Sequence, residues 1–134
     1  MHDIAQLNPL LQLLTADQLM LLLANGRSTL RHGWFGSPDV ERKPVALLRC
    51  SCGSCYLISE IDPTEPDIMY GLYEDAEGVP TLDTVDLDAL WDSGEGTDHV
   101  FARVASFVPT GTILDYWRLA RKSGSVDKLF RHLP

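Results

Sequence analysis

The chain has 134 residues, a length that suits one compact domain, and 45% of them are hydrophobic, which argues against wholesale disorder. Its formal net charge of -8 argues against binding nucleic acid through a broadly basic surface. Residues 50–102 carry thirteen Asp and Glu and no Lys or Arg, whereas residues 1–49 and 103–134 have net charges of +1 and +4. Such a segment is typical of a solubilising face, a surface that meets a basic partner, or a mimic of nucleic-acid phosphates.

The N-terminal segment predicts helix in two pieces. Asn8 can cap a first turn, with Pro9 at the first helical position. Thr15 and Gln18 have the spacing of a capping box, and leucines then recur at helical spacing. Gly26 is a typical C-terminal stop, so we expect the second helix to end there.

Residues 27–43 are interpreted as an irregular connection, because glycines and a proline lie among polar residues. We expect the aromatic pair Trp34 and Phe35 to anchor this connection to the core. A binding contact made by the same pair is the alternative.

The middle of the chain predicts short strands separated by turns that contain glycine or proline. Five strands are expected, at residues 45–49, 55–61, 68–73, 81–85 and 100–108, with a short helix from Asp86 through Trp91. Because short turns join antiparallel strands, whereas parallel strands need long crossovers, the prediction is an antiparallel meander.

The chain is expected to end in helix, and this completes the predicted fold. Thr112 and Asp115 resemble a capping box, Gly124 ends the helix, and Ser125 caps a last turn. We therefore predict a single α+β domain over residues 1–134, in which an antiparallel meander sheet of four or five strands is packed on one face by the N- and C-terminal helices.

Three cysteines, Cys50, Cys52 and Cys55, lie within six residues. An odd, clustered set is a poor disulfide framework, and the chain shows neither a cationic leader nor a long apolar run, so a cytoplasmic protein without a membrane segment is expected. Three thiolates could bind zinc with His32 or His99 as the fourth ligand, although the second cysteine pair of a strong zinc motif is missing. The alternative is that they are small hairpin residues without a chemical role, of which Cys50 and Cys55 could oxidise across the strands.

Acidic residues cluster at a predicted strand end and the turn that follows it. Glu60, Asp62, Glu65 and Asp67 could hold a divalent cation or act as an acid–base pair. Alternatively, the neighbouring prolines make a rigid turn that the acids cap. A phosphate-binding glycine loop, a nucleophile elbow and a His-Glu-x-x-His motif are all missing from the sequence, so no catalytic constellation is identified and enzymatic activity is not expected.

Many short segments resemble a bacterial family of domains of unknown function, known mainly from plasmids and integrated conjugative elements. The matching segments are residues 13–16, 24–26, 56–63, 65–72, 85–90 and 107–109, followed by Tyr116, Ala120, Arg121 and Gly124. The family-like core spans about residues 13–124. The resemblance implies a mobile-element setting without an assigned activity. Cys50, Cys52 and the helical segment 125–134 are not part of the family pattern, so a metal site there would be particular to this protein.

The leading hypothesis is a non-enzymatic accessory protein of mobile genetic elements that binds a partner protein with a basic surface. Its contact surface would be acidic and would comprise Glu60, Asp62, Glu65, Asp67, Glu74, Asp75 and Glu77. One alternative is a metal-dependent enzyme that uses either Glu60, Asp62 and Asp67 or the cysteines. Another is a nucleic-acid mimic that inhibits a DNA-binding enzyme.

A group of basic residues near the C-terminus is relevant to the kind of partner that the protein binds. Its members are Arg118, Arg121, Lys122, Lys128 and Arg131. They are interpreted as a solvated face, or as partners of the acidic sheet in the same molecule or a neighbouring one, rather than as a direct nucleic-acid contact. A homodimer is left open, and no resident cofactor other than the zinc considered above is expected.

Overall fold

The computed structural model describes residues 8–32, 42–94 and 100–134. The elements, in chain order, are the 3-10 helix η2 (Leu11–Leu13), α1 (Ala16–His32), β1 (Ala46–Cys50), β2 (Cys55–Ile61), β3 (Ile68–Glu74), β4 (Pro80–Asp86), α2 (Leu87–Gly94), β5 (Phe101–Arg103), α3 (Ile113–Ser123) and α4 (Asp127–Phe130). Within these ranges no helix combines the length and apolar character that crossing a bilayer requires.

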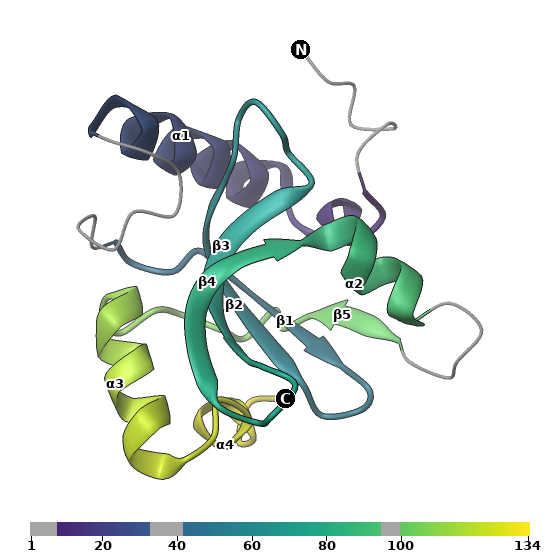
Figure 1. Ribbon diagram of the computed structural model, residues 1–134, viewed down its shortest axis with the longest axis vertical. Coiled ribbons are helices and arrows are strands. Elements are labelled where there is room, and N and C mark those ends of the chain that lie inside the picture. The colour runs from purple at the N-terminus through teal and green to yellow at the C-terminus, as the bar shows by residue number, and fades with distance from the viewer. Residues whose placement is uncertain (1–7, 33–41, 95–99) are drawn as a thin grey trace.

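The five strands form one antiparallel sheet in the order β4-β3-β2-β1-β5 (Figure 1). The first four strands follow one another as a meander, and β5 then returns to the other edge of β1. The α+β class and the antiparallel sheet predicted from the sequence are thereby confirmed. The predicted fifth strand, 100–108, is shorter in the structure, because β5 pairs with only the last three residues of β1 before the chain leaves the sheet.

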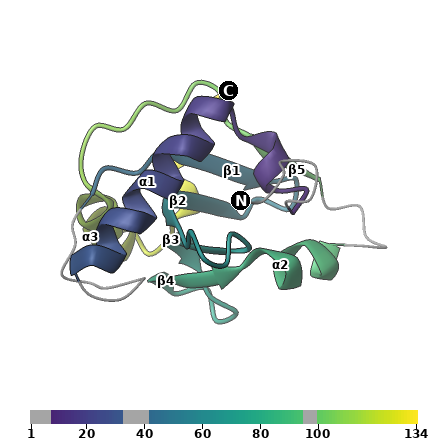
Figure 2. The same cartoon turned by 90° about the horizontal axis from the view of Figure 1, so that it is seen from above.

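The terminal helices pack on opposite faces of the sheet, which corrects the expectation that both cover one face. Leu48 and Ile58 lie in one apolar cluster with Leu22 of α1. Their sequence neighbours Leu47 and Leu57 lie in a second cluster with α3 and α4. Alternate residues of a strand point to opposite faces, so the two clusters lie on either side of the sheet. Figure 2 shows α1 lying across β1 and β2.

Helix α1 begins as predicted but ends later. The amide of Gln18 donates to the Thr15 hydroxyl (3.1 Å) and the amide of Thr15 donates to the Gln18 side chain (3.0 Å), which confirms the capping box. The helix then continues through Gly26 to His32. A Cβ at Gly26 would lie 1.9 Å from the carbonyl oxygen of Ile61, so glycine here permits a close helix–strand contact and does not end the helix.

The prediction that residues 27–43 form an irregular connection is wrong for its first six residues. Residues 27–32 belong to α1, and the chain is described again from residue 42. The proposed role of Trp34 and Phe35 lies outside the described residues.

Candidate functional site

The acidic residues predicted to form one surface have different structural roles, and Glu60 is inside the protein. Glu60 is only 1% exposed. The Thr29 hydroxyl of α1 donates a hydrogen bond to its Oε2 atom. Arg42 in turn donates to the Thr29 hydroxyl from Nη2 (3.2 Å) and Nε (3.4 Å). The other carboxyl oxygen, Oε1, is buried without a hydrogen-bond partner among the described residues. Glu60 is therefore not accessible to a partner protein.

Burial raises the pKa of Glu60 above its ordinary value, and the Thr29 hydrogen bond and the Arg42 charge oppose that effect. The pKa of the paired residue Tyr70 is also raised, first by burial and then by the charge of Glu60. The Glu60 carboxylate is thus removed from water and accepts one hydrogen bond within the described residues. The stability of the fold should therefore depend strongly on that hydrogen bond.

A local irregularity in β2 lies next to the buried Glu60. The register with β3 shifts between Ile58 and Glu60. The last pair between β1 and β2 joins Ala46 to Ile58, so the end of β2 extends beyond β1. Helix α1 contacts this end, where the side-chain amide of Asn25 donates a hydrogen bond to the backbone carbonyl of Ser59 (3.0 Å). The alternating sequence of β2 predicts an ordinary strand and contains no sign that Glu60 is covered by a helix.

Two further acids cap turns, and for Asp62 this is what the alternative interpretation of the sequence expects. Asp62 accepts hydrogen bonds from the amide (2.9 Å) and hydroxyl (2.8 Å) of Thr64. Asp75 accepts from the amides of Glu77 (3.0 Å) and Val79 (2.9 Å) in the β3–β4 hairpin. Such side-chain acceptors are typical of Asp in turns.

The acids proposed for metal chemistry do not gather into a site. Glu60 is buried and Asp62 caps a turn. Asp67 is half-buried, and its backbone carbonyl accepts a hydrogen bond from the Leu87 amide (2.8 Å). Over residues 8–32, 42–94 and 100–134, no three His, Cys, Asp or Glu side chains are arranged to hold a metal ion. Glu65 and Glu77 are exposed to solvent.

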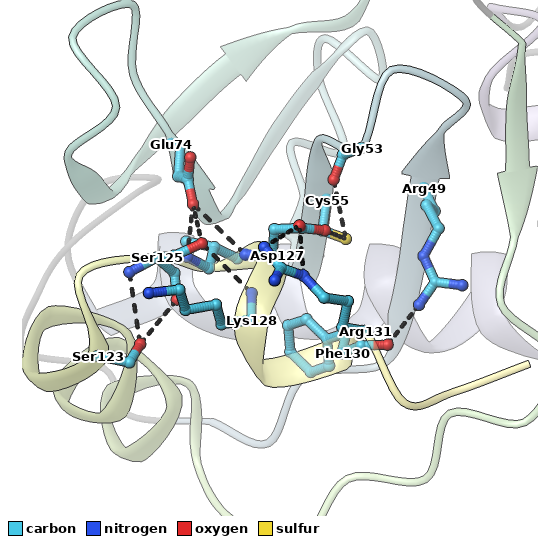
Figure 3. Close-up of polar contacts among 11 residues, drawn as sticks. Arg49, Gly53, Cys55, Glu74, Ser123, Ser125, Asp127, Lys128, Phe130 and Arg131 are labelled. Atoms are coloured by element: carbon cyan, nitrogen blue, oxygen red, sulfur yellow. Dashed lines mark hydrogen bonds and ion pairs between the residues drawn. The ribbon is translucent and has the colours of Figure 1, made fainter.

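Glu74 joins the sheet to the C-terminal segment (Figure 3). Its Oε1 atom accepts hydrogen bonds from the Ser125 hydroxyl (2.8 Å) and the amides of Val126 (2.7 Å) and Asp127 (3.4 Å). At the other end of α4, Arg49 of β1 donates to the carbonyl of Phe130. An anion at the N-terminus and a cation at the C-terminus of a helix both favour its dipole, so the sheet holds α4 at both ends.

Replacing Glu74 with alanine is expected to lower the free energy of unfolding by about 2 kcal/mol, because the donors of residues 125–127 lose a charged acceptor. Urea denaturation measures this loss, and hydrogen exchange should accelerate at the amides of Val126 and Asp127. Glu77→Ala removes an exposed acid from the same hairpin and should change stability by less than about 0.5 kcal/mol. Equal effects of the two substitutions would contradict this role of Glu74.

An open groove of about 460 Å³ lies between the β3–β4 hairpin and α2. Its lining combines aromatic, acidic and aliphatic side chains, and consists of Tyr56, Tyr73, Glu74, Asp75, Ala76, Thr84, Val85, Asp86, Ala89 and Leu90. The rings of Tyr56 and Tyr73 stack with centroids 6.0 Å apart and an interplanar angle of 16°. Burial raises the pKa of Tyr73, and the charges of Asp83 and Asp75 raise it further. The groove therefore presents an aromatic surface in a negative environment.

Sequence reasoning missed Tyr56, Tyr73 and Asp86 as members of one groove. The signal that could have found the tyrosines is strand register. Because Leu57 pairs with Leu72, the next residues outward, Tyr56 and Tyr73, are brought together across the two strands. Asp86 was expected only as a helix cap, and it does accept the amides of Asp88 (3.0 Å) and Ala89 (3.3 Å).

The groove acids lack cationic partners within the part of the chain that the structure describes. There, the ion pairs join Arg118 to Asp115 (3.4 Å) and Arg131 to Asp127 (3.1 Å) in the C-terminal helices. Arg121 of the C-terminal cations lies over the Trp117 ring, 4.9 Å from its centroid. These arginines thus interact locally and not with the acidic sheet.

The three cysteines are free thiols and do not converge. Cys50 and Cys52 are neighbours in the β1–β2 turn, where the Cys52 amide donates to the Cys50 sulfur (3.3 Å). The Cys55 thiol instead donates to Asp127 (3.6 Å), and burial raises its pKa to about 11. Cys55 lies in the apolar cluster of Leu57, on the face opposite to that of Leu48. Cys50 is two residues beyond Leu48 in β1, so strand alternation places it on the face of Leu48, and oxidation between Cys50 and Cys55 is not supported.

The histidines considered as a fourth zinc ligand cannot be placed in this arrangement. The side chain of His32 and the whole of His99 lie outside the described residues.

The fold and the groove define an α+β protein in which an antiparallel sheet, covered by helices on both faces, carries an acidic, aromatic groove beside its β3–β4 edge. The chain belongs to the family described as "Protein of unknown function (DUF2958)", whose model matches residues 13–127. No curated protein and no solved structure matches the chain.

Proposed function

We propose that this protein is a non-enzymatic binding module that recognises a basic segment of a partner protein in the groove between the β3–β4 hairpin and α2. The observation that carries the proposal is that Glu74, Asp75 and Asp86 line one groove without a cationic partner in the described part of the chain. Uncompensated charge of one sign speeds association with a partner of the opposite sign and selects against like-charged partners.

The groove suits the side chain of arginine or lysine. A guanidinium or ammonium group is attracted to the face of a tyrosine ring, and Tyr56 and Tyr73 lie side by side in the lining. Asp75 and Asp86 each use Oδ1 for a turn or helix cap. Their second carboxyl oxygens would accept charge-assisted hydrogen bonds from the cation.

The family resemblance supplies the setting of the proposal: an accessory role in a plasmid or conjugative element, in the cytoplasm. The nucleic-acid mimic and the metal-dependent enzyme receive less support. Asp62 caps a turn and Glu60 is buried, which leaves fewer carboxylates to imitate phosphates or to bind a metal.

The double substitution Asp75→Asn and Asp86→Asn tests the proposal, because asparagine keeps the capping oxygen and removes the charge. Fluorescence anisotropy with a labelled arginine-rich peptide should show about tenfold weaker binding to this variant at low salt. Tyr73→Leu should weaken binding by about threefold through the lost cation–π contact.

The matched control is Glu65→Gln with Glu77→Gln, which removes two exposed charges that do not line the groove. It should lower affinity by less than about twofold at 0.15 M salt, where distant surface charges are screened. Equal losses in the two double variants would show a diffuse charge effect and refute the groove as the binding site. Peptide binding that neither double variant alters would refute the acidic-surface proposal altogether.

A further inference from the structure

Two cysteines at the β1–β2 turn form a close pair that differs in exposure. Cys50, the last residue of β1, is 2% exposed, whereas Cys52 in the turn is exposed to solvent. The Cys52 amide donates to the Cys50 sulfur (3.3 Å), which brings the two residues into contact. The pair thus places one accessible sulfur next to one covered sulfur.

The surrounding turn is well defined by backbone contacts. The Cys50 amide donates a hydrogen bond to the Ser54 carbonyl (2.8 Å), and the Cys50 carbonyl accepts one from the Gly53 amide (2.9 Å). Gly53 has a φ angle of 103°, a left-handed conformation that favours glycine. Ser51 donates its amide to the Val100 carbonyl (2.8 Å), which attaches the turn to the segment that leads into β5.

Burial and hydrogen bonding shift the pKa values of the two thiols in opposite directions. Burial raises the pKa of Cys52, but hydrogen bonding with Cys50 and Ser54 outweighs it and lowers the pKa below its ordinary value. In the neutral form the Cys52 thiol donates to the Ser54 hydroxyl (3.5 Å). Burial and the hydrogen bond to Cys52 raise the pKa of Cys50. An exposed thiol of lower pKa beside a covered thiol of higher pKa matches the attacking and resolving roles of a dithiol pair.

We propose that Cys50 and Cys52 form a redox-active dithiol that exchanges with disulfides of small thiols or of other proteins. The Cys52 thiolate attacks one sulfur of the incoming disulfide, whose other sulfur leaves as a thiolate. Cys50 then loses its proton to solvent and attacks the Cys52 sulfur of the mixed disulfide, and the second thiolate is released. The protein dithiol is oxidised to a Cys50–Cys52 disulfide while one disulfide is reduced to two thiols. This activity is independent of the basic-peptide groove proposed above.

Cys55→Ser gives the sharpest test, because it leaves only the proposed pair. Folded Cys55→Ser protein is incubated with oxidised glutathione and then alkylated, and the mass of the intact protein is measured by mass spectrometry. The expected product has lost two hydrogens and takes up no alkylating agent. Cys50→Ser with Cys55→Ser should stop at a stable glutathione adduct on Cys52, because the resolving thiol is missing. The adduct on Cys52 should form about tenfold faster than the one on Cys50 in Cys52→Ser with Cys55→Ser.

Three outcomes would overturn the proposal. The first is a native Cys55→Ser protein that still takes up two alkyl groups after oxidised glutathione. The second is a disulfide that forms only in urea, which would mean that the folded turn does not permit the bond. The third is the loss of two thiols in Cys50→Ser or Cys52→Ser that carries an intact Cys55, which would assign the disulfide to another pair. Circular dichroism of each variant establishes that it is folded before the comparison.

Discussion

Gly26→Ala is expected to destabilise the protein by about 3 kcal/mol or more, although alanine is the better helix former. The added Cβ would lie 1.9 Å from the Ile61 carbonyl oxygen and 3.1 Å from the Pro63 ring. The first of these atoms is backbone in β2, so relief requires the helix or the strand to move. Chemical denaturation of the two proteins measures the difference in the free energy of unfolding.

The sign of this change in the free energy of unfolding shows whether the steric contact with β2 or the helix propensity of residue 26 has the larger effect. In an exposed helix interior, Gly→Ala stabilises by about 1 kcal/mol. Ala24→Gly, at an exposed position two residues earlier in α1, is the matched control and should cost about that amount. A Gly26→Ala protein as stable as the natural one would show that α1 does not depend on the close approach to β2.

Thr29→Val is expected to lower the free energy of unfolding by about 3 kcal/mol at pH 8. The substitution keeps the shape of the side chain but removes the hydroxyl that donates to Glu60. Neither oxygen of the buried carboxylate would then have a hydrogen bond within the described residues. Thr29→Ser, which keeps the hydroxyl and loses a methyl group, should cost about 1 kcal/mol.

The dependence on pH tests the same contact. The pKa of Glu60 in the folded protein is raised above its ordinary value of 4.5, so between these two values the folded chain holds a proton that the unfolded chain releases. The contribution of Glu60 is therefore most favourable below about pH 4.5 and declines as the pH rises through the folded-state pKa. Glu60→Gln should remove this decline from a plot of stability against pH.

A double-mutant cycle gives the decisive comparison. In the Glu60→Gln background, Thr29→Val should cost less than half of its penalty in the natural protein at pH 8, because no buried charge is left unpaired. The same penalty in both backgrounds would show that Thr29 acts through packing alone and that the hydrogen bond to Glu60 contributes little.

Local signals in the sequence predicted much of the fold. Thr15 with Gln18, and Thr112 with Asp115, form the capping boxes that their three-residue spacing indicates. Gly124 ends α3 in the left-handed conformation, with a φ angle of 82°. The second, third and fourth strands lie within one residue of the predicted bounds, since each is enclosed by turns rich in glycine or proline.

The candidate site was predicted only in part. Sequence analysis identified Glu74 and Asp75 as acidic candidates, and both line the groove. The tyrosine pair depends on the register between β2 and β3, which joins residues 56 and 73. That register was not part of the prediction, so the aromatic side of the groove could not be recognised.

The sequence by itself determined the elements and their order, because caps, turns and hydrophobic periodicity act within a few residues. Only the tertiary structure decided that Gly26 lies inside α1, that Glu60 is buried and that the terminal helices cover opposite faces. Each of these features depends on a contact between distant segments: a helix against a strand carbonyl, a hydroxyl against a carboxylate, and apolar side chains on two sides of one sheet. Such contacts form only when packing brings the segments together, and no short-range pattern in the chain records them.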